Sequence, residues 1–397
     1  MHGRMVPSLE RASECVSRWC RWHVAASNDS AQSDCRGRLS LSLSGKCVRF
    51  MNVWPYRERF FKRTSLTLHK CVESRYCQRF TDRARAYMTT VLVLVENLDT
   101  YLPILENSGF QLIRAPTPEK RAEAIATHGQ AISAVVTRGP LGFFTEEMDA
   151  LPHLRIICVS GAGYEKVDLP AAKERGITVT NGAGVNADTV ADHALALLLS
   201  LVRDIPQADA SVRRSEWRKA VRPSMAGKRL GIIGLGAVGL AIAKRAAAFD
   251  IVIGYHNRKP RNECPYTWHA TAQALAAESD FLVVATPGGN STLHLVDAQV
   301  LEALGAEGFL VNIARASVVD THALVNALQT EQIAGAALDV FDDEPNVPDV
   351  FKTLNNVVLT PHVGGLSPEA SRDSVQKVND NLLAFFSGQP VLTPVSE

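Results

Sequence analysis

The chain has 397 residues, which suits two domains, because single hydrophobic cores rarely grow beyond ~250–300 residues. Hydrophobic residues make up 46% and charged residues 21%, the composition of a soluble globular protein. The net charge of +1 gives no case for nucleic acid as a partner, and the longest apolar stretch, around residues 194–202, is far shorter than the ~20 residues of a membrane span. We therefore expect neither nucleic acid nor a membrane as partner.

Residues 1–87 differ in character from the rest of the chain. They carry 17 Lys and Arg against 7 Asp and Glu, and they hold six of the eight cysteines. These cysteines follow no secretory signal pattern and match no zinc spacing. Three interpretations stay open: an organelle transit peptide, a basic partner-binding arm, or a disordered or non-native extension. We favour the extension, take Met88 as the functional start, and expect a cytoplasmic protein.

Between residues 88 and 186, short apolar runs alternate with helical patterns. Each run is brief, β-branched and bounded by glycine, which is typical of buried parallel strands. The predicted strands are Val91–Val95, Ala134–Thr137, Arg155–Ser160 and Ile177–Thr180. The alternation of strand and helix predicts a parallel sheet with helices on both faces.

A long apolar-faced helix follows over Asn186–Leu201, with Asn186 or Asp188 as its N-cap and His193 as a structural residue. The basic residues after it are more typical of a solvated helix face than of a binding patch. They are Arg213, Arg214, Arg218, Lys219 and Arg222. A final amphipathic helix is predicted over Ser367–Phe386.

A glycine motif stands between a predicted strand and a predicted helix. The strand Arg229–Ile233 leads into a G-x-G-x-x-G turn with glycines at 234, 236 and 239, then into a helix over Leu240–Ala248 and a strand over Ile251–Tyr255. The three glycines permit the tight turn, the close approach of a pyrophosphate, and close packing of helix on strand. The helix N-terminus offers free N–H groups to the anion. This setting indicates a dinucleotide site, and a glycine-rich turn without a ligand is the alternative.

The residues after the second strand of this unit indicate which dinucleotide binds. An NAD site places Asp or Glu there, about 20 residues on, to hold the ribose 2′-hydroxyl. Here His256 stands in that position, and Asn257, Arg258, Lys259, Pro260 and Arg261 follow. Cations suit the 2′-phosphate of NADP. The pattern favours NADP(H), with NAD(H) possible, over a merely solvated basic loop.

Three later segments carry polar residues at the carboxyl ends of apolar runs, the edge at which open parallel sheets bind ligands. They are Asn312-Ile313-Ala314-Arg315, Asp339-Val340-Phe341-Asp342-Asp343-Glu344-Pro345 and Thr360-Pro361-His362-Val363-Gly364-Gly365. Reduction of a 2-keto acid needs a proton for the carbonyl oxygen, which His362 can supply. A buried carboxylate at Glu344 would favour the charged imidazole. Arg315 can hold the substrate carboxylate or carbonyl by charge-assisted hydrogen bonds. Read singly, each of the three could instead be a structural residue.

These motifs, in this order, resemble the D-isomer-specific 2-hydroxyacid dehydrogenase family, nearest its glyoxylate/hydroxypyruvate reductase branch. The resemblance covers residues 88–397 and departs from the family at Ala316, where glycine is usual, so only the local loop geometry is in question. It implies that Arg315, Glu344 and His362 are catalytic and that Asp339 lies near the nicotinamide. It also implies a homodimer, with the helix over Asn186–Leu201 helping the contact.

The resemblance implies an α/β protein of two Rossmann-like domains, in which a doubly wound dinucleotide domain (187–365) is inserted into a flavodoxin-like substrate domain (88–186 and 366–397). We predict no metal. The predicted cofactor residues are Gly234, Leu235, Gly236, Ala237, Val238, Gly239, Asn257, Arg258, Lys259, Thr286, Pro287, Ile313, Ala314, Arg315, Asp339, His362 and Gly364. The predicted substrate residues are Ser160, Gly161, Ala162, Leu141 and Arg315.

The predicted function is NADPH-dependent reduction of a small 2-keto acid of the glyoxylate/hydroxypyruvate type to the D-2-hydroxy acid. The glycine-rich turn after the third strand can present backbone N–H groups to the substrate carboxylate, although ordinary turn geometry is the alternative there. Two alternative functions stay open. One is reduction of another 2-keto acid, such as 2-ketogluconate. The other is a cofactor-sensing, corepressor-like regulator, which would keep these residues without turnover.

Overall fold

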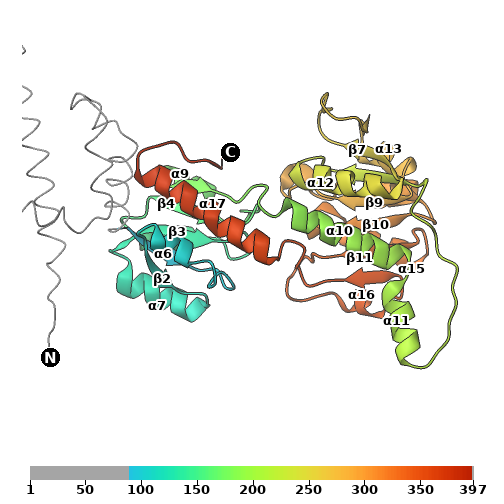
Figure 1. The fold of residues 1–397 in the computed structure, drawn as a ribbon, viewed down its shortest axis with the longest axis horizontal. Coiled ribbons are helices and arrows are strands. Elements are labelled where there is room, and N and C mark those ends of the chain that lie inside the picture. The colour runs from blue at the N-terminus through green and yellow to red at the C-terminus, as the bar shows by residue number, and fades with distance from the viewer. Residues whose placement is uncertain (1–88, 396–397) are drawn as a thin grey trace, which may run out of the picture. The chain divides into compact units, whose positions relative to one another are not determined.

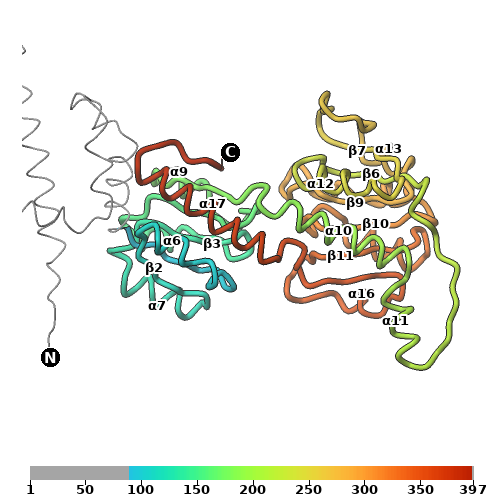
Figure 2. The backbone as a smooth tube through the Cα atoms, in the orientation of Figure 1, coloured from blue at the N-terminus to red at the C-terminus, as the bar shows by residue number. Residues whose placement is uncertain are grey.

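The computed structural model describes residues 89–395. The extension over residues 1–87 and the expected start at Met88 lie outside these residues. Two parallel β-sheets with helices on their faces make up the described part, which confirms the α/β prediction (Figure 1). Figure 2 follows the chain through the first sheet, into the second at α10, and back along α17.

The first sheet has five parallel strands in the order β2-β1-β3-β4-β5, the order of flavodoxin-like folds. Its strands are β1 Thr90–Val93, β2 Gln111–Arg114, β3 Ile132–Thr137, β4 Ile156–Val159 and β5 Thr178–Thr180. Side chains of β1 alternate between two cores: Val91 and Val93 lie in one, Leu92 in the other. Burial on both faces explains why these strands are apolar throughout.

Helices cover both faces of the first sheet. They are α6 Pro103–Asn107, α7 Pro118–His128, α8 Thr145–Asp149, α9 Leu169–Glu174 and α17 Pro368–Phe386. The C-terminal helix α17 packs its residues Val375, Val378 and Leu382 into the core that contains Val91. The last helix of the chain is therefore part of the same layer structure as its first described strand.

The second sheet has seven parallel strands in the order β12-β11-β10-β9-β6-β7-β8. The order reverses at β6, so the sheet is doubly wound, as predicted. Its strands are β6 Arg229–Ile233, β7 Val252–His256, β8 Thr267–His269, β9 Phe281–Val284, β10 Phe309–Asn312, β11 Gly335–Leu338 and β12 Val357–Leu359. Ligands bind such sheets at the carboxyl edge beside the point of reversal, which here lies between β6 and β9.

Helices also cover both faces of the second sheet. They are α10 Ala187–Val202, α12 Ala237–Ala246, α13 Ala272–Ala277, α14 Ala298–Leu304, α15 Thr321–Gln329 and α16 Asp349–Thr353, with short 3₁₀ turns η1 Ala247–Phe249, η2 Asn290–Thr292 and η3 Ala316–Val318. Helix α11 Ile205–Arg213 follows α10 and contributes no residue to the two cores of this sheet. α10 and α12 share one core, and α13, α14 and α15 share the other.

Several local predictions need correction. The helix after the glycine turn begins at Ala237 rather than Leu240, and the strand after it ends at His256 rather than Tyr255. Asn186 occupies the N-cap position of α10, but its side chain makes no cap hydrogen bond. The basic residues 214–222 lie beyond the end of α11 in irregular backbone, not on a helix face. Helix ends depend on single capping contacts, which a periodic pattern does not specify.

Candidate active site

The glycine turn between β6 and α12 has the geometry that its three glycines require. Gly234 has φ +99°, and a Cβ there would lie 2.7 Å from the backbone nitrogen of Thr286. A Cβ at Gly239 would lie 2.2 Å from the carbonyl oxygen of Gly234. At Gly236 a Cβ would meet nothing within 4 Å, so this side of the turn is open. A bound dinucleotide could therefore approach the backbone here, at the N-terminus of α12.

Two residues after β7 hold this turn in place. The amide of Leu235 donates to Asn257 Oδ1 over 2.7 Å, and Arg261 Nη1 donates to the Leu235 carbonyl over 2.8 Å. Arg261 also pairs with Glu263. Asn257 and Arg261 therefore fix the backbone of the turn, a role that the residue types alone did not reveal.

Two cations of the same segment stay available. Arg258 and Lys259 are exposed, and neither has an ion-pair or hydrogen-bond partner within residues 89–395. His256, which stands where an NAD enzyme has a carboxylate, contacts the carbonyl oxygen of His269 through Nδ1 at 3.0 Å. The end of β7 therefore presents free positive charge and no carboxylate at its last residue, which fits a 2′-phosphate.

The other predicted cofactor residues follow β6, β9, β10, β11 and β12. Leu235 is fully buried, so only its backbone can face a ligand. Thr286 and Pro287 follow β9, and the carbonyl of Pro287 accepts a hydrogen bond from Thr292 over 2.8 Å. Ile313 and Ala314 follow β10 and are buried. Their contact with a cofactor stays a prediction.

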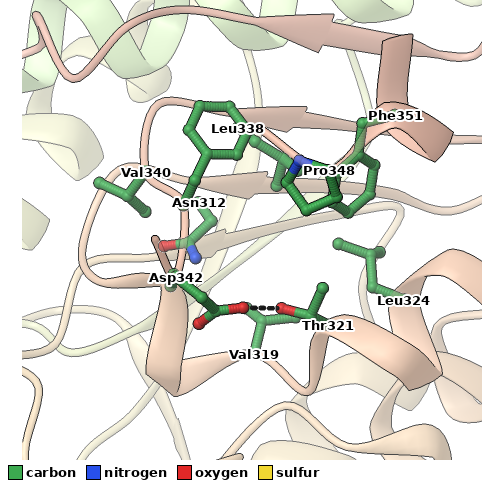
Figure 3. Close-up of a pocket in the computed structure, with 11 residues that line it drawn as sticks. Asn312, Val319, Thr321, Leu324, Leu338, Val340, Asp342, Pro348 and Phe351 are labelled. Carbon is green, nitrogen blue, oxygen red and sulfur yellow. Dashed lines mark hydrogen bonds between the residues drawn. The ribbon is translucent and has the colours of Figure 1, made fainter. Parts of the chain in front are cut away.

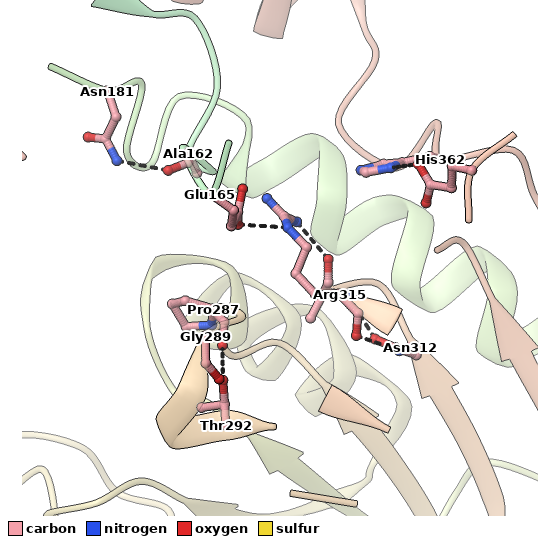
Figure 4. Close-up of polar contacts among 11 residues, drawn as sticks. Ala162, Glu165, Asn181, Pro287, Gly289, Thr292, Asn312, Arg315 and His362 are labelled. Atoms are coloured by element: carbon pink, nitrogen blue, oxygen red, sulfur yellow. Dashed lines mark hydrogen bonds and ion pairs between the residues drawn. The ribbon is translucent and has the colours of Figure 1, made fainter. Parts of the chain in front are cut away.

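Asn312 at the end of β10 shapes the loop that carries Arg315. Its Nδ2 donates to the Arg315 carbonyl over 3.0 Å, and its Oδ1 accepts from the Ala314 amide over 3.0 Å. The guanidinium of Arg315 donates from Nε to Glu165 Oε1 over 2.8 Å and from Nη1 to the Ala314 carbonyl over 2.6 Å (Figure 4). Glu165 was not among the predicted site residues. No motif marks it, although it stands only two residues after Gly163.

In the turn at residues 160–163, after β4, the carbonyl groups have hydrogen-bond partners and the amides do not. The carbonyls of Ser160, Gly161 and Ala162 accept hydrogen bonds from Ser374, Gly182 and Asn181. The amides of residues 161–163 have no partner in the described part of the chain. Free, adjacent N–H groups of this kind can bind an anion.

Leu141, the remaining predicted substrate residue, packs partly buried against both cores of the first sheet. Its contact with a substrate stays a prediction.

Asp339, at the end of β11, anchors the loop that carries His362. Only 2% of Asp339 is exposed, and its carboxylate accepts hydrogen bonds from the Thr360 hydroxyl at 2.6 Å, the Val363 amide at 3.0 Å and the Gly364 amide at 2.8 Å. His193 of α10 contacts Thr360 Oγ1 at 3.1 Å. Asp339 therefore satisfies buried donors of the loop, a structural task that fits the buried position.

His362 and Glu344 form the pair that the motifs predict. The imidazole Nδ1 lies 2.7 Å from Glu344 Oε2, and Oε1 of the same carboxylate accepts from the Phe341 amide over 3.0 Å. His362 has φ +53°, in the left-handed region, held by the anchored loop. The expectation that Glu344 is buried was wrong, because 31% of its side chain is exposed. With Nδ1 on the carboxylate, Nε2 is the ring nitrogen that can exchange a proton with a substrate.

A small pocket behind β10 and β11 is separate from these groups. It encloses about 20 Å³, room for one water molecule, and is lined mainly by apolar side chains such as Leu338 and Phe351 (Figure 3). At its polar end Thr321 donates to Asp342 over 2.6 Å. None of Arg315, Glu344 and His362 lines it, so it is a packing gap rather than a substrate site.

Residues 89–395 contain no group of three or more His, Cys, Asp or Glu residues that could hold a metal ion. Over the same range, no helix combines the length and the apolar character that crossing a membrane requires.

Comparison with known proteins places this geometry in a family. The model of the D-isomer specific 2-hydroxyacid dehydrogenase NAD-binding domain matches residues 195–364. The chain is 42% identical to hydroxyphenylpyruvate reductase of Plectranthus scutellarioides and 41% identical to a glyoxylate/hydroxypyruvate reductase of Arabidopsis thaliana, in each case covering 75% of this chain and 96% of the other. It is 41% identical to 2-ketogluconate reductase of Gluconobacter oxydans, covering 70% and 91%.

Among solved structures, an NADPH-dependent glyoxylate/hydroxypyruvate reductase of Sinorhizobium meliloti, in complex with NADP and malonate, superimposes with a TM-score of 0.71. The two sequences are 40% identical, and the match covers 78% of this chain and 97% of that one.

Proposed function

The chain belongs to the D-isomer specific 2-hydroxyacid dehydrogenase family, and we propose that it reduces a small 2-keto acid of the glyoxylate/hydroxypyruvate type to the D-2-hydroxy acid with NADPH. One observation carries the proposal: the His362–Glu344 pair, the Arg315 guanidinium and the free amides of residues 161–163 all lie at carboxyl edges of the two sheets. They supply a proton donor, a cation and a set of N–H groups for the substrate carboxylate, the three functions that reduction of a keto acid needs.

Each residue has a defined task in this proposal. The amides of residues 161–163 and the guanidinium of Arg315 bind the substrate carboxylate and orient the carbonyl. A reduced nicotinamide, when bound, supplies the hydride that the carbonyl carbon receives. His362 gives the proton on Nε2 to the carbonyl oxygen, and Glu344 keeps the ring oriented through Nδ1. In the reverse direction the neutral imidazole takes the proton from the hydroxyl group.

The preference for NADPH rests on the segment after β7. Arg258 and Lys259 are the exposed, unpaired cations there, and each can donate charge-assisted hydrogen bonds to a 2′-phosphate. The open side of the turn at Gly236 gives room for the pyrophosphate. The residues present therefore fit NADP(H), and they leave NAD(H) without a carboxylate at His256 for its ribose.

Turnover with a panel of keto acids tests the proposal. We expect NADPH oxidation with glyoxylate and hydroxypyruvate, and D-glycerate as the product of the latter. Hydroxyphenylpyruvate and 2-ketogluconate belong in the panel, because relatives named for them are 42% and 41% identical. If no 2-keto acid is reduced although NADPH binds, the protein is not this reductase and the cofactor-sensing regulator becomes the better hypothesis.

We also propose a homodimer. Helix α10 buries its apolar face within the chain, with eight buried residues. An exposed apolar group lies instead on α11 and the segment after it: Ile205, Val212, Trp217 (81% exposed) and Val221 (99% exposed). Exposed patches of this kind mark protein interfaces. Analytical ultracentrifugation should give twice the chain mass, and Trp217→Glu should give the monomer.

A cytoplasmic location is the last part of the proposal. Cys158 and Cys264 form no disulfide within residues 89–395, and burial raises the pKa of the Cys158 thiol to about 12. Cysteines without a disulfide are typical of proteins from a reducing compartment. Fractionation of the source cells checks this, and recovery from an organelle fraction would favour the transit-peptide interpretation of residues 1–87.

A further inference from the structure

The three nitrogens of the Arg315 guanidinium have different surroundings. Nε donates to Glu165 and Nη1 donates to the Ala314 carbonyl. Nη2 has no hydrogen-bond partner within residues 89–395, and it lies against the turn after β4, since a Cβ on Gly163 would be 1.9 Å from it. Two fixed nitrogens therefore hold the third beside Gly163, in the turn that carries the free amides of residues 161–163.

Two glycines make room for Glu165 in this arrangement. A Cβ on Gly163 would lie 2.7 Å and 2.9 Å from its two carboxylate oxygens, and a Cβ on Gly139 would lie 2.9 Å from Oε2. Gly139 follows β3 and Gly163 follows β4, so neighbouring strands of the first sheet leave this space. A side chain at Gly163 would meet both the Arg315 guanidinium and the Glu165 carboxylate, and one at Gly139 would meet the Gly163 carbonyl oxygen at 2.7 Å as well as the carboxylate.

Stability does not explain the pair. The side chains of Glu165 and Arg315 are 38% and 31% exposed. Ion pairs with such exposure contribute little to folding. A carboxylate beside a cation in a site for anionic substrates also reduces the attraction of that cation for the substrate. A feature that adds little stability and weakens anion binding needs a functional reason.

We propose that Glu165 is a positioning residue for Arg315. It holds the guanidinium so that Nη2 and the amides of residues 161–163 bind one substrate carboxylate together, and its charge limits how tightly the anion is held. The inference rests on the proposed function, because it assigns Arg315 to the substrate. Glu165 itself need not touch the substrate.

Two substitutions separate orientation from charge. Glu165→Gln keeps an oxygen that accepts from Nε but removes the charge, so KM for glyoxylate should fall about three- to tenfold while kcat stays within about twofold. Glu165→Ala removes the acceptor too, and the loose guanidinium should lower kcat by about tenfold or more, since small misplacements of a binding group cost up to ~10²-fold. Glu174→Gln is the matched control, because this exposed residue precedes β5 at the opposite edge of the sheet.

Binding of oxamate, an unreactive analogue of a 2-keto acid, supplies a readout that does not need turnover. In the presence of NADPH, calorimetry should show oxamate bound about three- to tenfold more tightly by Glu165→Gln than by the unmutated protein, and more weakly by Glu165→Ala. Suppose that the oxamate affinities of the unmutated protein and the two variants follow this order, but that the unmutated protein reduces no keto acid. The proposed reaction is then wrong and the positioning role of Glu165 stands. If both variants match Glu174→Gln, or if Gln and Ala lower kcat equally, Glu165 does not position Arg315.

Discussion

At the carboxyl edge of the five-stranded sheet the candidate site is mostly backbone. The turn after β4 offers amides, and glycines at positions 139 and 163 leave space. At the carboxyl edge of the seven-stranded sheet the site is made of charged side chains, Arg315, Glu344 and His362, each held by a neighbouring polar group. The geometry of the first edge depends on the absence of side chains at its glycines. The geometry of the second depends on hydrogen bonds that hold its charged residues. Substitutions should therefore act by steric clash at one edge and by loss of chemistry at the other.

The largest effect on kcat should come from a substitution at the carboxyl edge of the seven-stranded sheet. His362→Ala removes the proton donor, and we expect kcat to fall by about 10²–10⁴-fold, the usual contribution of a positioned acid or base. KM should change less, because Arg315 and the amides still bind the substrate. Steady-state kinetics with glyoxylate and NADPH measure both. His128→Ala, an exposed histidine at the end of α7, is the control. A His362 variant with near-normal kcat would exclude His362 from proton transfer.

The backbone edge should respond to a single methyl group. In Gly163→Ala the new Cβ would stand 1.9 Å from Arg315 Nη2, so the guanidinium must move away. We expect kcat/KM for glyoxylate to fall by up to about 10²-fold, mainly through KM, as a misplaced binding group predicts. Unchanged NADPH affinity, followed by fluorescence, would show that the second sheet is intact. Normal kinetics in this variant would mean that the carboxyl edge of the five-stranded sheet tolerates side chains and does not depend on their absence.

Changes to the segment after β7, where Arg258 lies, should have an intermediate effect on the preference for NADPH over NADH. Each charge-assisted bond to a 2′-phosphate is worth roughly 1.5–3 kcal/mol, and exposure reduces this. At ~1.4 kcal/mol per tenfold, the unmutated protein should prefer NADPH by about tenfold to a few hundredfold in kcat/KM. Arg258→Ala should remove most of that preference by raising KM for NADPH, with NADH almost unaffected. Adding His256→Asp should reverse it, although this change also loses the contact with the His269 carbonyl. Equal values for both cofactors in the unmutated protein would contradict the assignment.

The fold was predictable because its signals are local. Apolar runs bounded by glycine locate the buried strands, and the G-x-G-x-x-G turn lies between β6 and α12 as predicted. The motif also predicts that positions 234 and 239 must be glycine, and an added Cβ at either one would indeed clash with backbone atoms. The strand orders and the helix ends depend on packing and capping between distant segments, and a single pattern does not contain them.

The site was predictable in residue types but not in partners. His362 and Glu344 stand 18 positions apart, and their motif context brought them together correctly. Glu165 and Arg315 stand 150 positions apart, and no motif relates them. Arg261 looked like another phosphate-binding cation, yet Glu263 and the Leu235 carbonyl hold it. Which charges are free is decided by three-dimensional neighbours, so the sequence could name the cations but could not say which of them stay unpaired.

The smallest effect concerns α10 and α17, the helices at which the chain passes between the two sheets. Ser367 caps α17 by accepting from the Ala370 amide over 3.0 Å, and its hydroxyl contacts Thr189 of α10 at 2.9 Å. Ser367→Ala should lower the free energy of unfolding by about 1 kcal/mol, or Tm by roughly 2–4 °C, the cost of a lost N-cap. Asn186 makes no cap hydrogen bond on α10, so Asn186→Ala should cost less. Thermal and urea unfolding of the two variants measure this. The side chain of Asn186 lies close to Gly365 through Nδ2. An equal or larger loss of stability for Asn186→Ala would therefore mean that packing near Gly365, and not capping, determines the stability of these connections.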